Sequence, residues 1–281
     1  MSRWDPAAVA DAQHPGPDAA RHAAERIWQA RGQGLTLDAA ATLGGLTMDE
    51  AYAVQNEVTR HRLVRGERVV GWKLGYTSAV MRRQMGVDQP NHGPLTDAML
   101  LASGDAVSDE LVQPRVEPEI ALCFARPLTA VGGHVGRAEV LAAVDVARAC
   151  LEVVHSTWTG YRFTIEQNTA DGSSAAQVVL GGVLATAELD AVDVALDVDG
   201  EPAGRGRGSD ASGHPADGVC WLLDRLAPLG LGLAAGDVVI TGGLTRAAPL
   251  EPGATITARF TGARLPAPVE VAVRRRAAVH R

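Results

Sequence analysis

The chain has 281 residues, of which 46% are hydrophobic and 21% charged, with a formal net charge of -7 at pH 7. This composition is typical of a globular protein, and the chain is long enough to bury a large core in one domain or two. The acidic balance argues against nucleic acid as a partner, and no cluster of lysine and arginine indicates an anionic membrane surface. The sequence has no signal-peptide pattern and no apolar run long enough to span a bilayer.

Three cysteines, Cys123, Cys150 and Cys220, are far apart in the sequence and have apolar neighbours. An odd number with this spacing matches neither a disulfide framework nor a set of zinc ligands. We therefore expect an intracellular protein of the reducing cytoplasm.

Two helices are predicted near the start of the chain, after 16 residues that are expected to be mobile. The first begins at Pro17 and ends at the glycines of residues 32–34, because proline is favoured in the first turn of a helix and glycine just beyond its end. The second begins at Thr47 and Glu50, which have the spacing of a capping box, and ends at Gly66.

Beyond these helices the sequence consists mainly of short β-like runs between Gly, Pro and Asp turns. "VDVALDVDGEPAG" alternates in polarity and turns at residues 199–200, and "GDVVITGG" and "ATITARF" are two further runs. Helices are predicted over residues 137–151 and 215–230. We expect an α+β fold with a helical N-terminal arm (residues 1–70) on a strand-rich core (residues 71–281), without a linker that separates two domains.

The stretch "QPRVEPEIALC" places Glu117 and Glu119 on either side of a proline, in an apolar run typical of a buried strand. Residues i and i+2 of a strand point to the same face, so the two carboxylates would lie together, repel each other and be costly to bury. Pro118 cannot donate to a sheet ladder, so we expect an edge strand or a bulge at this point. Glu152 is a third acid in apolar surroundings. It lies where the helix predicted over residues 137–151 gives way to the apolar run "LEVV".

Three carboxylates form a hard ligand set that suits Mg²⁺ or Mn²⁺ better than zinc or copper. The ordinary alternative is that one of the glutamates lies at the surface or pairs with Arg115. A second candidate is Lys73, which stands between Gly71 and Gly75, where the backbone can approach another group closely. Such a lysine could hold an anionic substrate as a point charge, or it could be an ordinary solvated side chain.

Other candidate residues carry weaker signals. His155 follows Glu152 closely and is either near the site or a core histidine, whereas His214 precedes a predicted helix and is expected to cap it. The turn "TGGLT" offers backbone N–H groups and a hydroxyl that suit a carboxylate. "GWKLG" is not a phosphate-binding loop, and the absence of a G-x-S-x-G elbow disfavours a serine hydrolase.

Seven segments of the sequence carry a family resemblance in their order: "GWKLGYTS", "MGVDQPNHGPLTD", "QPRVEPEIALC", "LEVVHS", "TADGSSAAQVVLGG", "SGHPADGVCWL" and "AGDVVITGGLT". Over residues 45–260 the chain resembles the fumarylacetoacetate hydrolase superfamily, most closely its branch of 2-hydroxypenta-2,4-dienoate hydratases and 4-oxalocrotonate decarboxylases. The ordered run of motifs is far more specific than any one of them.

The resemblance implies a mixed β-sheet roll, a homo-oligomer, a homologous hydratase as a further partner, and one Mg²⁺ or Mn²⁺ ion held by three carboxylates. Matched residue by residue, the metal ligands would be Glu117, Glu119 and Glu152. The cation would then supply the positive charge that the paired glutamates require. Lys73 matches the family's lysine beside the substrate carboxylate and enolate.

The site residues that we expect, beyond the metal ligands, fall into two groups. The catalytic residues are Lys73, His155 and Asp171. The substrate-binding residues are Asn91, His92, Gln113, Thr241 and Gly242. The chain departs from the family pattern at four places: His155 replaces an aspartate, Gly172 replaces an asparagine, "ARLPAPVE" stands where the family has "LGS", and His92 replaces an aromatic residue.

The implied activity is that of a metal-dependent lyase acting on an unsaturated 2-oxo acid. The metal, as a Lewis acid, would stabilise negative charge on the 2-oxo oxygen. Loss of a distal carboxylate as CO₂ requires mainly this electron sink, whereas hydration also requires a titratable group that moves protons. The hydratase branch is expected to have an aspartate in the segment that here reads Pro90-Asn91-His92-Gly93, and Asn91 is neither acid nor base. The sequence therefore favours a decarboxylase of the 4-oxalocrotonate (2-oxohex-3-enedioate) type.

Four alternatives remain open from the sequence. A hydratase would keep the metal and add water, and a hydrolase of acylpyruvates would need an activated water for which no clear His–Glu pair is found. A family member could also be repurposed for another 2-oxo acid in a biosynthetic pathway. A non-catalytic partner subunit would have no physical need for three converging acids.

Overall fold

The structure is a computed structural model that describes residues 17–262 and 264–277. The helices are α2 (Pro17–Gly32), α3 (Ala39–Thr42), α4 (Met48–Val64), α5 (Ala79–Met85), α6 (Arg137–Ala143), α7 (Ile165–Ala170) and α8 (Pro215–Leu226). Short 3₁₀ turns are η1 (Asp97–Met99), η2 (Thr159–Tyr161), η3 (Leu189–Ala191), η4 (Gly208–Asp210) and η5 (Ala227–Leu229). The strands are β1 (Val69–Gly75), β2 (Asn91–Thr96), β3 (Leu100–Ala102), β4 (Arg115–Phe124), β5 (Val144–Val154), β6 (Ala175–Leu184), β7 (Asp193–Val198), β8 (Glu201–Arg207), β9 (Val238–Ile240), β10 (Ala248–Pro249), β11 (Thr255–Thr261) and β12 (Val269–Arg274).

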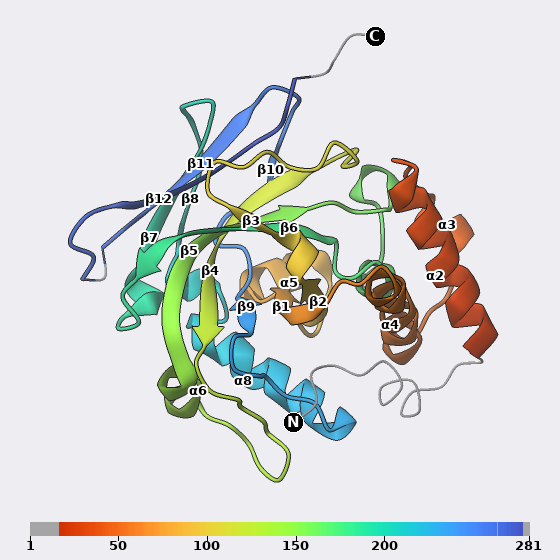
Figure 1. Cartoon of the computed structure of the whole chain (residues 1–281), viewed down its shortest axis with the longest axis horizontal. Helices are drawn as coiled ribbons and strands as arrows, with labels where there is room; N and C mark the ends of the chain where they lie inside the picture. The colour runs from red at the N-terminus through yellow and green to blue at the C-terminus, as the bar shows by residue number, and fades with distance from the viewer. Residues whose placement is uncertain (1–16, 263, 278–281) are drawn as a thin grey trace.

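The strands form two sheets. The larger has eight strands in the order β2-β1-β9-β4-β5-β6-β3, with β10 paired to β4, and the smaller has the order β12-β11-β7-β8. Because β1 pairs in parallel with β9 and β3 in parallel with β6, while the other pairs are antiparallel, the larger sheet is mixed. Its long strands curl around the middle of the molecule, as Figure 1 shows. The predicted α+β roll with helices at its N-terminal side is confirmed.

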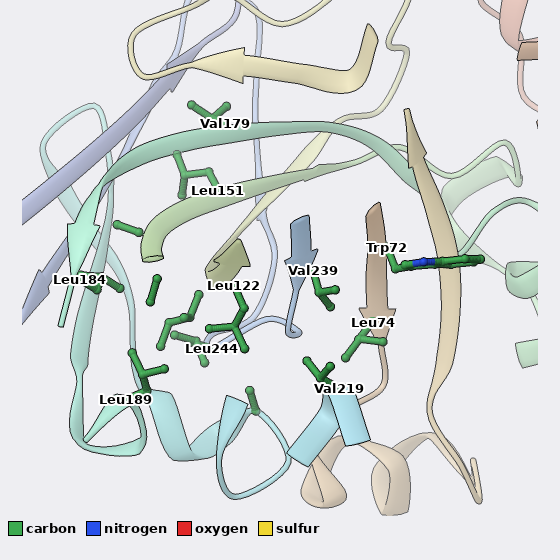
Figure 2. Packing of buried hydrophobic residues seen from close by; sticks show 14 of the residues in the cluster. Trp72, Leu74, Leu122, Leu151, Val179, Leu184, Leu189, Val219, Val239 and Leu244 are labelled. Atoms are coloured by element: carbon green, nitrogen blue, oxygen red, sulfur yellow. The ribbon is translucent and has the colours of Figure 1, made fainter. Parts of the chain in front are cut away.

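The main core lies between the curled sheet and α8. Figure 2 shows Val219 of α8 beneath Leu74 of β1 and Val239 of β9, and all three side chains are fully buried. Leu122 of β4 and Leu151 of β5 extend the same cluster across the sheet. Helix α8 therefore holds β1, β9 and β4 together, and these are strands that carry or border the candidate site.

The N-terminal helices form a second, smaller core. Helices α2 and α4 pack against each other to one side of the sheet (Figure 1), with Ile27, Val54 and Trp158 in a common buried cluster. The capping box of Thr47 and Glu50 is present as predicted. The predicted mobility of residues 1–16 lies outside the described residues, and the domain boundary at residue 70 stays a prediction.

The predicted helix over residues 137–151 is wrong in its second half. Helix α6 ends at Ala143, and β5 begins at Val144, where the backbone turns to extended dihedral angles (φ -72°, ψ 131°). The segment "VDVARACLEVV" is rich in β-branched valine and pairs on one side with β4 and on the other with β6. These long-range ladders outweigh the helical preference of its alanines, so Glu152 stands on a strand and not after a helix.

The predicted edge or bulge at Pro118 is also wrong, because β4 is an inner strand. The only shift of its register with β5 lies between Cys123 and Phe124. On its other side, β10 pairs with residues 115–116 and β9 with residues 121–123, which leaves a gap beside Pro118. Loop N–H groups, including that of Leu244 to the carbonyl of Pro118, fill this gap, so the missing N–H of the proline interrupts no ladder.

Other predicted elements agree with the structure. The turn at residues 199–200 joins β7 to β8, with positive φ at both positions, and the runs "GDVVITGG" and "ATITARF" contain β9 and β11. The helix predicted over residues 215–230 is α8 followed by η5. No helix among the described residues combines the length and the apolarity that a membrane crossing requires.

We expect Leu122→Ala to lower the free energy of unfolding by about 2–5 kcal/mol, because it removes a fully buried side chain from the main core. Leu35→Ala is the matched control, since that leucine is 52% exposed, and it should change stability by less than about 0.5 kcal/mol. Urea unfolding of the three proteins measures both values. Equal stabilities of the two variants would show that the core does not lie where the structure places it.

Candidate metal centre and active site

Three glutamates from two neighbouring strands converge in the middle of the larger sheet. Glu117 of β4 and Glu152 of β5 are direct partners in the antiparallel ladder, and Glu119 lies two residues further along β4 on the same face. One carboxylate oxygen from each lies within 4.8 Å of the others. The strand pattern thus brings Glu117 and Glu119 together as predicted, and the register between β4 and β5 adds Glu152.

Glu119 and Glu152 are buried, Glu117 is half-buried, and the three carboxylates repel one another. Burial raises the pKa of Glu117 to about 7, and the charge of Glu152 adds to the rise while Lys73 and Arg115 oppose it. Burial, followed by the charge of Glu152, holds the pKa of Glu119 well above its ordinary value. Burial also raises the pKa of Glu152, although Lys73 opposes the change. The protein alone therefore holds three carboxylates in a place where they resist ionisation.

Lys73 is the cation that the structure places beside them. Its Nζ lies 3.1 Å from Oε1 of Glu152 and donates a hydrogen bond of 2.8 Å to the carbonyl of Ser173. Burial disfavours the charged lysine, but Glu152, Glu119 and Glu117 outweigh burial, so the pKa of Lys73 is raised and the ammonium stays charged. Lys73 is also the only lysine in the 281 residues. That composition was a signal for its special role.

The loop after β9 closes over the carboxylates because it contains two adjacent glycines. The N–H of Gly242 donates to Oε2 of Glu119 at 2.7 Å. Gly242 has φ +107°, and a Cβ atom there would lie 1.9 Å from Oγ1 of Thr77. A Cβ atom at Gly243 would lie 2.2 Å from a carboxylate oxygen of Glu117. Any side chain at either position would push this loop off the acidic cluster.

The cluster has the chemistry of a site for a divalent cation. Oε1 of Glu119 and Oε2 of Glu152 are buried and have no hydrogen-bond donor among the described residues. Three carboxylates against one ammonium leave two negative charges uncompensated when all are ionised. Carboxylate oxygens are the ligands that Mg²⁺ and Mn²⁺ prefer. Glu117, Glu119 and Glu152 would hold such an ion, which supplies the charge that the protein lacks.

A cavity of about 330 Å³ opens beside the cluster, and Lys73 and Glu117 form part of its wall. Arg115, Arg246 and Tyr161 also line this cavity. The guanidinium of Arg115 lies 4.2 Å from the centre of the Tyr161 ring, which holds it in place. The sequence analysis considered Arg115 only as an ion-pair partner and missed Arg246, because nothing in the local pattern "GGLTRAAP" links that residue to the carboxylates.

Three predicted substrate-binding residues use their polar groups within the protein. The amide of Asn91 donates to Asn168 and to Thr169, at 2.9 Å each, and accepts from the hydroxyl of Ser173 at 2.8 Å. The side chain of Gln113 donates to the carbonyls of residues 156 and 158 and accepts from the N–H of residue 160. The hydroxyl of Thr241 donates to the carbonyl of residue 120 at 2.9 Å. None of the three is among the residues that line the cavity.

The structure places two predicted histidines in other cavities. His92 stacks on Tyr52 with ring centres 4.6 Å apart and lines a cavity of about 250 Å³ beneath α4 and α8. This follows from the alternation of β2, which sends Asn91 and His92 to opposite faces. His155 lines a polar cavity of about 200 Å³ next to α2 and α4. Neither histidine lines the cavity beside the carboxylates.

Asp171, predicted to be catalytic, is fully buried and engaged by neighbours. Its carboxylate accepts from the hydroxyl of Thr157 at 2.6 Å, from the N–H of Thr157 at 2.9 Å and from the guanidinium of Arg31 at 2.6 Å. It ends α7 just before the turn that carries Ser173, the acceptor of Lys73. His214 caps α8 through Nδ1, as predicted.

We expect the thermal stability of the metal-free protein to fall as the pH rises from about 5 to 8. The pKa of Glu117 is about 7 in the folded state and 4.5 ordinarily, so the folded state binds more protons in this window and stability is lost as they dissociate. Glu117→Gln removes this ionisation and should raise the melting temperature at pH 8. Differential scanning calorimetry without metal measures both, with Glu201→Gln on the exposed strand β8 as the control.

The same variants test the cation. Excess Mg²⁺ should stabilise the wild type at pH 8, and Gln at position 117, 119 or 152 should weaken Mn²⁺ binding by roughly tenfold or more in titration calorimetry, because a hard cation depends on ligand charge. Wild-type affinity in all three variants would contradict the metal assignment.

Known proteins of similar sequence and structure belong to one family. Residues 68–269 match the family model described as Fumarylacetoacetate (FAA) hydrolase C-terminal. A 4-oxalocrotonate decarboxylase of Pseudomonas sp. strain CF600 is 37% identical over 221 residues, covering 77% of this chain and 83% of that protein. A 2-keto-4-pentenoate hydratase of Burkholderia vietnamiensis is 37% identical over 244 residues, covering 85% of this chain and 92% of that one.

A solved structure shares the whole architecture. The 4-oxalocrotonate decarboxylase from Pseudomonas putida G7, complexed with magnesium and adipate, has a TM-score of 0.85 at 30% identity, covering 93% of this chain and 99% of the other. The predicted branch, hydratases and decarboxylases together, is the one in which the relatives are found. By sequence match and by fold, this chain belongs to the fumarylacetoacetate hydrolase family.

Proposed function

We propose that the protein is a Mg²⁺- or Mn²⁺-dependent decarboxylase of an unsaturated 2-oxo dicarboxylate, with 4-oxalocrotonate as the substrate. One observation carries the proposal: Glu117, Lys73, Arg115 and Arg246 all line a single cavity. A dicarboxylate can meet cationic groups at both of its ends in such a cavity. The decarboxylase relatives in sequence and in structure support this choice.

The chain's own groups have separable tasks in this reaction. A cation bound by the three glutamates supplies Lewis acidity toward the 2-oxo oxygen. Lys73 adds a fixed ammonium beside the same position, because Glu152 and the carbonyl of Ser173 hold its Nζ. Arg115, held against Tyr161, and Arg246 attract the distal carboxylate and orient the chain of the substrate.

The bond that breaks joins C5 of the substrate to its distal carboxylate. CO₂ leaves, and the electron pair moves through the conjugated carbons to the 2-oxo oxygen, which takes up a proton to give 2-hydroxypenta-2,4-dienoate. No water is consumed. The ammonium of Lys73 stabilises the negative charge that develops on this oxygen, and the buried setting strengthens that interaction.

The groups around the cavity favour decarboxylation over hydration. Hydration needs a residue that exchanges protons near neutral pH, and neither histidine nor aspartate lines the cavity among the described residues. Glu117 has a pKa of about 7 in the metal-free protein, but as a ligand it would be held ionised by the bound cation. Burial, with a contribution from Glu117, raises the pKa of Tyr76 to about 12, so that phenol stays protonated. The amide of Asn91 is uncharged and bonded to the protein on both sides.

The second candidate is 2-keto-4-pentenoate hydratase, favoured by the relative that is 37% identical over 85% of this chain. We propose Mg²⁺ as the first metal to test, because the solved decarboxylase structure contains it. A homo-oligomer and a complex with a homologous hydratase stay predictions from the family resemblance.

The direct test follows 2-oxohex-3-enedioate by ultraviolet absorbance with Mg²⁺ and measures released CO₂. Consumption of 2-hydroxypenta-2,4-dienoate without CO₂ release would favour the hydratase instead.

We expect Arg246→Gln to raise the Michaelis constant of the dicarboxylate by roughly threefold to tenfold and to leave kcat within about twofold. A guanidinium on the leaving carboxylate binds the ground state at least as well as the transition state, so it contributes to binding and not to the rate of bond breaking. Initial rates over a range of substrate concentrations give both constants. Arg205→Gln, on the exposed strand β8, is the matched control. A variant that loses kcat with an unchanged Michaelis constant would contradict this role.

Lys73→Ala should lower kcat, measured from initial rates, because it removes a charged contact at the developing oxyanion. The loss of transition-state stabilisation should be a few kcal/mol. Metal binding should stay intact or become tighter, because a positive charge beside the carboxylates has been removed. Lys73→Arg should rescue poorly, since a planar guanidinium does not replace a compact ammonium between Gly71 and Gly75. Turnover by Lys73→Ala within about twofold of wild type, below ~0.5 kcal/mol, would exclude Lys73 from the site.

A further inference from the structure

A second polar cavity, of about 200 Å³, lies directly behind the wall of the proposed active site. Val154 and Ser174 line the active-site cavity, and the next residues in the chain, His155 and Ala175, line the second one. The second cavity is bounded on its other side by the N-terminal helices. The two cavities therefore share the strand ends of β5 and β6 as a common wall.

Three arginines line this second cavity: Arg31 of α2, Arg62 of α4 and Arg65 just after α4. Arg62 pairs with Glu67 at 3.2 Å, whereas Arg65 lies 4.5 Å over the ring of Trp28 and has no carboxylate partner among the described residues. Glu67 and the exposed Glu110 are the acids of the lining. Because Arg31 also pairs with Asp171, Arg65 is the one arginine of the lining whose charge no carboxylate of the described residues meets directly.

Arg31 ties the cavity to the turn at residues 171–174. One of its terminal nitrogens donates to Oδ1 and to the carbonyl of Asp171, at 2.6 Å each, and its Nε donates to Thr157 at 3.0 Å. Asp171 lies two residues before Ser173, whose carbonyl accepts from Lys73. A change at Arg31 is thereby passed to the lysine of the active site.

The electrostatic state of the cavity favours an anion. Burial, and then the charge of Arg31, lower the pKa of His155 to about 4, with Arg275 acting in the same direction and Asp171 against it. Burial and Arg31 also lower the pKa of Arg62, which Glu67 opposes. Nδ1 of His155 is buried without a hydrogen-bond partner, in a side chain that is only 4% exposed. Positive charges are held close together here, beside a ring nitrogen that has no partner.

We propose that this cavity binds a small oxyanion, either inorganic phosphate or a short dicarboxylate, through Arg31, Arg62, Arg65 and His155. The guanidinium groups offer donors that the protein leaves unused, and an anion between Arg31 and Arg62 relieves their mutual repulsion. Because Arg31 also holds Asp171, occupancy changes the setting of residues 171–174 and so of Lys73.

The test uses the full chain without metal, titrated by calorimetry with phosphate, with succinate, and with chloride at matched ionic strength. We expect saturable binding of phosphate or succinate but not of chloride, and the stronger of the two identifies the source. Arg65→Gln and His155→Ala should each weaken binding by about tenfold or more. Arg65→Lys, which keeps the charge, should retain most of it.

Arg246→Gln is the control for the active-site cavity, since Arg246 does not line the second one. Binding that survives in Arg65→Gln but disappears in Arg246→Gln would place the anion in the active site and overturn the proposal, as would no saturable binding. The proposed link to Lys73 is read from amide hydrogen exchange of residues 171–175, which phosphate or succinate should slow or speed in the wild type and leave unchanged in Arg65→Gln. None of these measurements requires turnover, so failure of the proposed decarboxylase activity would not affect them.

Discussion

The repulsion among three crowded carboxylates, two of them fully buried, is the constraint on which the rest of the site depends. Glu117 and Glu152 face each other across one ladder, and Glu119 stands on the same face of β4. The fold answers this repulsion locally with one ammonium and one backbone N–H, from Lys73 and Gly242. It leaves the rest of the charge to a cation. The glycines at 242 and 243 follow from the same need, because the loop that carries them comes very close to the carboxylates.

The N-terminal helices take part in the site although they contribute no residue to the cavity wall beside the carboxylates. Arg31 of α2 fixes Asp171, and Gln55 of α4 donates to the carbonyls of His92 and Thr169. Both contacts end on segments that position Lys73 or its partner Ser173. The N-terminal helices therefore help to hold the turn at residues 171–174 in place, and loss of their packing should loosen that turn.

The sequence was sufficient for what depends on local period and on motif order. The alternation of a strand predicted that Glu117 and Glu119 share a face, the capping box predicted α4, and the run of motifs predicted the family. The prediction from sequence was wrong where pairing with distant strands determines the local structure. The first half of β5 was predicted as the end of a helix, because the sequence does not show that β4 and β6 pair with it on either side.

Contacts between distant parts of the chain were also beyond its reach. Lys73 bonds to Ser173 across 100 residues and Arg31 to Asp171 across 140, and no spacing rule connects such positions. Arg246 was missed for the same reason, because its place beside the carboxylates comes from the loop after β9. The strand period likewise separates His92 from Asn91, although the two were grouped as neighbours in one motif.

The presence of a single lysine has a practical consequence. Reagents that map or immobilise proteins through ε-amino groups find none on the surface of this molecule, since Lys73 is 4% exposed and every other basic side chain outside the histidines is arginine. Acylation of an ε-amine can occur here at one atom only, and that atom lies against Glu152. The extent of reaction at this atom therefore reports how often the buried site opens to solvent, with no background from other ε-amino groups.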